Sequence, residues 1–415
     1  MRLTHKYERV FTPSAPVRSR HLFMGRAQEE ADLLADLRRP GVHPIITGER
    51  GVGKTTLARL AISPKNGRVM VGCGQNTNFS DLARAILHEL GLSTDEVEST
   101  SVTATHHKEA LAGPVSVSSE GIERHASRSI GLGQRELTPW ILYQHIRDHK
   151  QKLAIILDEY DLIPKRNKRC HDGVAELIKH LADHSEDCDS RIVIVGVARS
   201  AEALLGHHES IARSGDEIYV RPLRRKDIVD FLATAERDTG ITFVAPVKQS
   251  IVLEANGYPY YVHLIGLLSV EAMLAQDRHL RVVSETHYSI AQRRAWMRSV
   301  RSVLGRHRRT LQGLTHEQVS VIRALVSHSA GVQKRTALQE ECARDYQLDP
   351  ERFKALLVTL IEDKRLLHWK ENDGTVRFTD PLLPLFLRGW WFPLKKVPID
   401  DRAAEKQLDL FDGEE

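Results

Sequence analysis

Residues 42–56 read VHPIITGERGVGKTT, and this stretch decides the fold. Apolar residues run up to Thr47, a glycine-rich turn follows, and the segment from Lys54 has the apolar spacing of a helix. Two glycines, a lysine and a threonine match the phosphate-loop pattern, between a predicted strand and a predicted helix as its mechanism requires. We therefore expect backbone N–H groups and a helix N-terminus to surround nucleotide phosphates here. The residues concerned are Gly48, Glu49, Arg50, Gly51, Val52, Gly53, Lys54, Thr55 and Thr56.

Four side chains in two segments have expected chemical roles. Lys54 would reach the β and γ phosphates of ATP, and Thr55 would ligate Mg²⁺. A second apolar strand, AIILDE, ends in Asp158 and Glu159. Phosphates lie at the carboxyl edge of such sheets, so we expect Asp158 to hold the water shell of Mg²⁺ and Glu159 to orient the attacking water. The alternative is a solvated acidic loop, but a glutamate at this position favours hydrolysis over binding alone.

The pattern around this motif predicts a doubly wound α/β domain, followed by helical regions. Apolar strands that alternate with amphipathic helices indicate a parallel sheet covered on both faces. A helical lid follows, and three helical patterns with two strand-like runs around an Asp-Gly turn predict a winged helix. The predicted parts are an N-terminal extension (1–20), the nucleotide-binding α/β domain (21–223, with an insertion at about 95–136), the lid (224–310), the winged-helix domain (311–391) and a disordered tail (392–415).

The composition is that of an ordinary soluble protein. The chain has 415 residues, of which 41% are hydrophobic and 27% charged, enough for two or three domains. Four scattered cysteines lack the spacing of a zinc site and the density of a disulfide scaffold, which favours a cytoplasmic location. No apolar run is long enough for a bilayer, and MRLTHKYERV has charges where a signal peptide is apolar. We therefore expect neither membrane insertion nor secretion.

With its phosphate loop and acidic strand, the chain resembles AAA+ and related STAND-type P-loop ATPases. LFMGRAQEE is similar to the signature that opens such modules, which implies that Gly25, Arg26 and Glu29 lie near the adenine. The fourth strand ends in VGVARS, and the resemblance implies Arg199 as a γ-phosphate sensor, where many AAA+ proteins have asparagine. Arg213 matches the place of an arginine finger supplied to a neighbouring subunit. An ordinary surface arginine is the alternative reading of Arg213.

The resemblance extends over roughly residues 20–390. The lid segment ANGYPYYVHLIG looks like the Gly-x-Pro element of STAND and archaeal-type ATPases, with Gly257 and Pro259 matching. The segment RFTDPLLPLFLR resembles the end of the winged helix in origin-recognition and archaeal-type ATPases. The chain departs from helicase loaders because no arginine occupies the usual second-sensor position.

An arginine-rich segment between His287 and His316 contains no acidic residue. Its apolar residues fall at helical spacing, so we expect an amphipathic helix whose basic face neutralises DNA phosphates. The alternative is a solvated helix whose arginines pair with acidic groups elsewhere. The predicted recognition helix, PERFKALLVTLIEDK, carries the acidic residues Glu351, Glu362 and Asp363, so we expect DNA contacts to be mostly phosphate-directed. The arginines are Arg293, Arg294, Arg298, Arg301, Arg306, Arg308 and Arg309.

The acidic tail contains QLDLF at residues 407–411. This stretch resembles the short clamp-binding peptide of bacterial replication and repair proteins. Gln407 would form a hydrogen bond at the rim of a groove, while Leu410 and Phe411, with Leu408 beside them, supply apolar side chains for a pocket. The alternative is a tail that packs back on its own domain.

The sequence as a whole predicts a cytoplasmic bacterial ATPase that uses ATP and Mg²⁺. It would form a homo-oligomer in its ATP state, engage DNA and dock to the sliding clamp, in replication control, repair or mobile-element maintenance. One alternative is a STAND-type regulatory or anti-phage defence ATPase that binds a protein effector. Another is a transposition-type ATPase regulator that selects target DNA.

Overall fold

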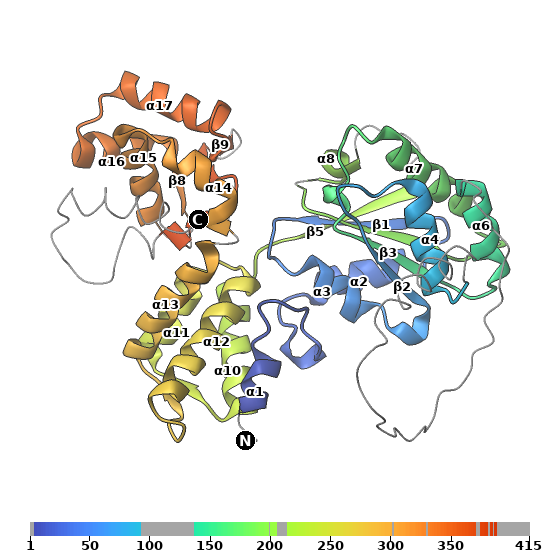
Figure 1. Cartoon of the computed structure of the whole chain (residues 1–415), viewed down its shortest axis with the longest axis horizontal. Helices are drawn as coiled ribbons and strands as arrows, with labels where there is room; N and C mark the ends of the chain where they lie inside the picture. The colour runs from blue at the N-terminus through green and yellow to red at the C-terminus, as the bar shows by residue number, and fades with distance from the viewer. Residues whose placement is uncertain are drawn as a thin grey trace, which may run out of the picture. The chain divides into compact units, whose positions relative to one another are not determined.

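The computed structural model describes residues 4–92, 137–198, 200–205, 214–300, 303–328, 331–370, 374–380, 382–384 and 386–387. The chain divides into two compact units (Figure 1). The sheet unit comprises Arg26–Gly48 and Lys54–Val220, and the helical unit comprises Met1–Gly25, Glu49–Gly53 and Arg221–Glu415. Across the described ranges, no helix has the length and apolar character needed to cross a membrane.

The sheet unit is built on five parallel strands in the order β2-β3-β4-β1-β5. Every residue of β1, β3 and β4 is buried, as expected for strands that are covered by helices on both faces. The predicted doubly wound α/β fold is therefore confirmed. The strands are β1 (His43–Gly48), β2 (Arg68–Gly72), β3 (Ala154–Asp158), β4 (Arg191–Val195) and β5 (Gly215–Val220).

Helices of the sheet unit form two layers (Figure 1). Helices α4, α6 and α7 pack on one another and build the main apolar core with the strands, whereas α2 and α3 pack together. Polar caps start the helices of the first layer: the Asn78 side chain, for example, accepts a hydrogen bond from the Asp81 N–H at 2.9 Å. The bounds are α2 (Ala27–Asp36), α3 (Lys54–Ala61), α4 (Phe79–Glu89), α6 (Pro139–Asp148), α7 (Lys168–Asp183) and α8 (Ala201–Leu205), with short turns η2 (Pro64–Asn66) and η3 (Tyr160–Leu162).

The helical unit contains the helices of the region expected to form the lid, and the N-terminal segment packs against them. Phe11 is fully buried and lies edge-on to Phe231 and Phe243. Gly266 makes room for this ring, because a Cβ at that position would come within 2.4 Å of it. Residues 4–12 therefore contribute to the lid core rather than only preceding the next domain. The elements are α1 (Thr4–Val10), η1 (Arg20–Leu22), α10 (Arg225–Thr239), β6 (Thr242–Phe243), α11 (Ala245–Ala255), α12 (Pro259–Gln276), β7 (Val282–Val283) and α13 (Glu285–Val300).

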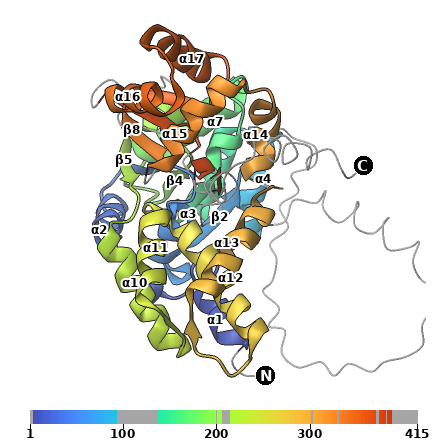
Figure 2. The same ribbon diagram turned by 90° about the vertical axis from the view of Figure 1, so that its left-hand side faces the viewer.

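The end of the helical unit holds the three predicted helices (Figure 2) and the two predicted strands, which pair antiparallel. A third strand, β8, pairs antiparallel with β10 and was not predicted. The winged-helix assignment of this region stays a prediction. The elements are α14 (Val303–Gln312), α15 (His316–Ser327), β8 (Val332–Lys334), α16 (Arg335–Tyr346), α17 (Pro350–Glu362), β9 (Leu367–Lys370) and β10 (Thr375–Phe378).

Several sequence predictions fall outside the described residues and stay predictions. They concern the insertion at about 95–136, the tail 392–415, and the individual residues Arg199, Arg213, Arg301, Gln407, Leu408, Leu410 and Phe411.

Candidate functional site

The phosphate loop joins the end of β1 to the start of α3. Gly48 closes β1, and its N–H donates to the carbonyl of Ala198 at 3.0 Å. Gly51 and Gly53 have φ angles of 82° and 99°, a region that strains any residue with a side chain. Val52 between them is fully buried. Glycine at positions 51 and 53 is therefore required by the backbone path of the loop itself.

Lys54 and Thr55 begin α3 and contact the carboxyl ends of two different strands, β1 and β3. Lys54 is only 8% exposed, and its Nζ donates to the carbonyl oxygen of Gly48 at 3.0 Å. Thr55 Oγ1 donates to Asp158 Oδ1 at 3.0 Å. The structure thus brings together a hydroxyl and a carboxylate that are 103 residues apart in the chain. Oxygen ligands of this kind suit Mg²⁺, so the pair fits the ion that the sequence predicted.

Asp158 ends β3 in a mostly buried position. Burial raises the pKa of its carboxyl group, because desolvation disfavours the charged form. The hydrogen bond from Thr55, the N–H of Glu159, and the charges of Lys54 and Arg59 act in the opposite direction. Hydrogen-bond donors and cations therefore surround this carboxylate and offset part of the cost of burying it.

Glu159 follows directly, with a left-handed backbone at φ 55° and an exposed side chain. Such a conformation costs roughly 1–2 kcal/mol for a residue other than glycine, so the surroundings must hold it in place. Its N–H donates to Asp158 Oδ1 at 3.0 Å. The next residue, Tyr160, is buried and bonds through its hydroxyl to His171 Nδ1 at 2.9 Å. A glutamate at the carboxyl edge of the sheet is thereby fixed between two anchored neighbours.

The residues predicted near the adenine have local partners. Arg26 is 3% exposed, and its guanidinium donates to Glu29 at 3.0 Å at the start of α2. Gly25 has φ 70°, and a Cβ there would lie 2.5 Å from Asp227 Cγ, the carboxyl that caps α10. These contacts give structural reasons for a glycine at position 25, an arginine at 26 and a glutamate at 29. The role of these three residues in binding ATP stays a prediction.

The Gly-x-Pro element forms the turn between α11 and α12. Gly257 has φ 85°, and its carbonyl accepts the N–H of Leu223 at 2.8 Å. Pro259 is the first residue of α12, a position that needs no N–H donor. The sequence did not single out Tyr258 between them, whose hydroxyl donates to the carboxylate of Glu49 in the phosphate loop. No sequence signal separates this tyrosine from others in the lid.

The arginine-rich segment lies on α13 and α14. Arg298 is 3.5 Å from Glu271, and Arg306 is 2.9 Å from Asp380. Pairing with acidic groups, the alternative that the sequence left open, therefore holds for these two arginines. A separate group has exposed side chains and no acidic partner among the residues that the structure describes: Arg293, Arg294 and Arg309.

Known proteins include several with a similar fold. Solved structures similar to this chain include a Walker-type ATPase of Pyrococcus abyssi, with 15% identity, a TM-score of 0.55, and coverage of 91% of this chain and 99% of that chain. Others are the Aeropyrum pernix ORC1 protein in complex with DNA (15% identity, 94% and 97% coverage, TM-score 0.48) and Cdc6p from Pyrobaculum aerophilum (17%, 92% and 96%, 0.43). Comparison with curated proteins gives no match. Residues 40–205 match the model of the AAA domain family, and this match includes the phosphate loop and the acidic strand.

Proposed function

We propose that the chain is an AAA+ switch that binds and hydrolyses ATP. The observation that carries the proposal is the hydrogen bond between Thr55 and Asp158, which joins the phosphate-loop helix to the acidic strand. Lys54 and the loop N–H groups would hold the β and γ phosphates, and Glu159 would polarise the attacking water. Mg²⁺, held through Thr55 and Asp158, would neutralise charge on the phosphates.

The activity is tested by phosphate release from ATP, measured with Mg²⁺ and with excess EDTA. We expect release to require the metal. Light scattering during size-exclusion chromatography, with ATP or ADP and with or without duplex DNA, then tests assembly into a homo-oligomer through Arg213. If none of these conditions gives Mg²⁺-dependent phosphate release, the proposal is contradicted.

We also propose that the protein engages DNA, mostly through phosphates. Three exposed arginines on α13 and α14 have no acidic partner in the described ranges and can meet a polyanion. On α17, Arg352 is bonded to Glu317 at 2.9 Å, which engages one of the few basic groups of that helix. Contact through α13 and α14 is therefore better supported than base reading through α17.

Replacing Arg293, Arg294 and Arg309 with alanine should weaken DNA binding and reduce its salt dependence. Each phosphate contact that is lost lowers the slope of log K against log salt by about one unit. Fluorescence anisotropy of a labelled duplex over a series of salt concentrations measures both quantities. Arg147→Ala is the matched control, because Arg147 is an exposed arginine on α6 that pairs with its neighbour Asp148.

An unchanged slope in the triple variant would show that these arginines do not face DNA. If neither the parent nor the variant binds DNA, the STAND-type reading with a protein effector is favoured instead.

We further propose that QLDLF docks to a bacterial sliding clamp. Each large apolar side chain contributes about 1.5–3 kcal/mol when it is fully buried, and ordering the tail offsets part of this. The affinity should therefore be micromolar. Calorimetry with a purified clamp should show heat of binding for the parent and none for the Leu410→Ala, Phe411→Ala variant, while ATPase activity stays unchanged. A parent protein that gives no heat would exclude clamp docking.

A further inference from the structure

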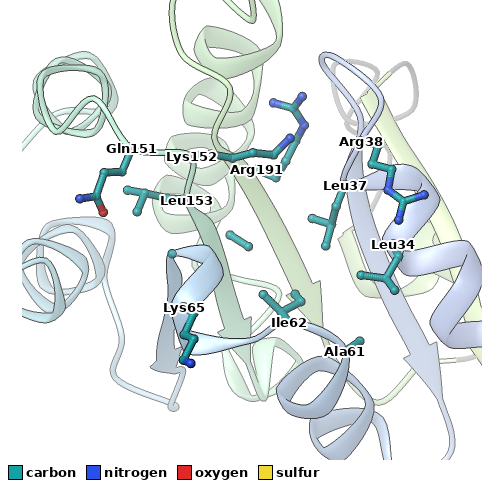
Figure 3. Close-up of a pocket in the computed structure, with 12 residues that line it drawn as sticks. Leu34, Leu37, Arg38, Ala61, Ile62, Lys65, Gln151, Lys152, Leu153 and Arg191 are labelled. Carbon is teal, nitrogen blue, oxygen red and sulfur yellow. The ribbon is translucent and has the colours of Figure 1, made fainter.

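A pocket of about 520 Å³ opens at the amino-terminal edge of the sheet unit (Figure 3). Ala154 and Arg191 line it at the first residues of β3 and β4, whereas Asp158 lies at the other end of β3. Four residue steps along a strand span roughly 13 Å, so the pocket is separate from the candidate nucleotide site. Its volume lies within the range of about 300–1,000 Å³ that is typical of ligand sites.

The interior of the pocket is apolar. Its aliphatic side chains come from α2, from the end of α3 and from the approach to β3, and Figure 3 shows them facing the hollow. They are Leu34, Leu37, Ala61, Ile62 and Leu153. Such a surface suits large aliphatic or aromatic side chains, because their burial removes apolar area from water.

The rim of the pocket is basic. Three exposed cationic residues line it, Arg38, Lys65 and Lys152, and a fourth that lines the pocket, Arg191, is fully buried; none of the lining residues is acidic. Lys152 and Arg191 share one carboxylate, that of Asp189, with Lys152 at 2.6 Å. Arg38 and Lys65 are exposed and, within the described part of the chain, have no acidic partner. Figure 3 shows these two side chains on different elements around the opening, so the positive charge is spread rather than gathered at one point.

This chemistry selects the kind of ligand. Cations placed on separate elements match several carboxylates along a chain better than a single anionic headgroup, and the apolar interior requires large apolar side chains between those carboxylates. An acidic peptide that contains leucine or phenylalanine meets both conditions. Complementary charge would favour its approach and register, while the apolar anchors would supply most of the affinity.

We propose that this pocket binds the carboxyl-terminal segment of a second copy of this chain. Residues 407–415, QLDLFDGEE, combine three large apolar side chains with four carboxylates and contain no lysine or arginine. The last described residue is Leu387, so the 19 residues 388–406 connect it to this segment and can carry the segment to a neighbouring molecule. The inference does not depend on ATP hydrolysis or on DNA binding, and it concerns the same peptide that a clamp would bind.

A labelled peptide of residues 402–415 tests the proposal by fluorescence anisotropy. The receptor is the full chain with Leu408, Leu410 and Phe411 changed to alanine, so that its own tail does not compete. We expect saturable binding in the micromolar range. The double variant Arg38→Glu, Lys65→Glu should bind the peptide at least tenfold more weakly. Each substitution places a carboxylate at the rim, where it would repel the carboxylates of the peptide. Both residues are exposed, so the variant should fold, and its melting curve checks this.

A second peptide, with Leu410 and Phe411 changed to alanine, has the same charge as the first. It distinguishes binding through buried apolar side chains from electrostatic attraction alone. It should bind at least tenfold more weakly than the parent peptide. Equal binding of the two peptides, no change in the Arg38→Glu, Lys65→Glu variant, or no binding at 300 µM protein, a concentration on the order of a hundred times the expected Kd, would each overturn the proposal. Clamp calorimetry is independent of this pocket, so failure here leaves the clamp proposal standing.

Discussion

Replacing Glu159 with glutamine is expected to leave ATP bound while stopping its hydrolysis. The amide keeps the size of the side chain but cannot accept a proton from the attacking water, and losing a general base lowers kcat by about 10²–10⁴-fold. The substitution leaves the backbone hydrogen bond from Glu159 N–H to Asp158 in place, because that bond does not involve the side chain. Lys54→Ala should instead abolish nucleotide binding, because Lys54 is the cation whose Nζ reaches back over the loop to Gly48 and would contact the phosphates.

Fluorescent nucleotide titration and single-turnover phosphate release measure the two effects separately. Glu186→Gln, an exposed glutamate in the same unit, is the matched control and should behave as the parent does. Hydrolysis at the parental rate in the Glu159→Gln protein would remove Glu159 from its role. Normal ATP affinity in the Lys54→Ala protein would place the phosphates elsewhere.

The candidate site could be predicted because its determinants are local in sequence. Glycines with positive φ, a lysine and a threonine sit within eight residues, and an apolar strand ending in two acids gives the partner segment. The contact between Thr55 and Asp158 then follows from the topology of a parallel sheet, whose carboxyl ends share one edge. The left-handed backbone conformation of Glu159 could not be predicted from the sequence, because glutamate has no preference for that conformation.

Features that depend on distant partners or on very short elements escaped prediction. The strands β6, β7 and β8 have two or three residues, too few to show a periodic pattern. The ion pairs of Arg298 with Glu271 and of Arg306 with Asp380 join residues that only the fold brings together. The packing of Phe11 in the lid depends on a gap at Gly266, which a sequence pattern does not reveal.

His43, at the start of β1, makes the sheet unit sensitive to acid. Its side chain is 1% exposed, and Nδ1 accepts the N–H of Ile192 at 2.9 Å, which leaves the proton on Nε2. Protonating Nδ1 would break that hydrogen bond and place two donors against each other. Burial, helped by the nearby charge of Arg191, lowers the pKa of His43 to about 3. As the pH falls below about 6.5, the imidazole becomes protonated in the unfolded chain, but in the folded protein it stays neutral down to about pH 3.

Lowering the pH from 7.5 to 5.0 should reduce the free energy of unfolding by about 2 kcal/mol through His43 alone. The unfolded histidine has a pKa near 6.5 and the folded one a pKa of about 3, so the unfolded state binds more protons between these values. The stability that His43 contributes is then fully present above pH 6.5 and is lost progressively as the pH falls toward 3.

His43→Asn tests this expectation, because the amide oxygen of asparagine can accept the Ile192 N–H and cannot be protonated in this pH range. Urea unfolding at both pH values should show the loss shrinking by about 2 kcal/mol in His43→Asn but not in His88→Asn, a control at an exposed histidine on α4. Equal losses in the parent and in His43→Asn would show that His43 does not cause the acid sensitivity. The cause would then be His263, a buried histidine of the helical unit whose pKa is lowered to about 4.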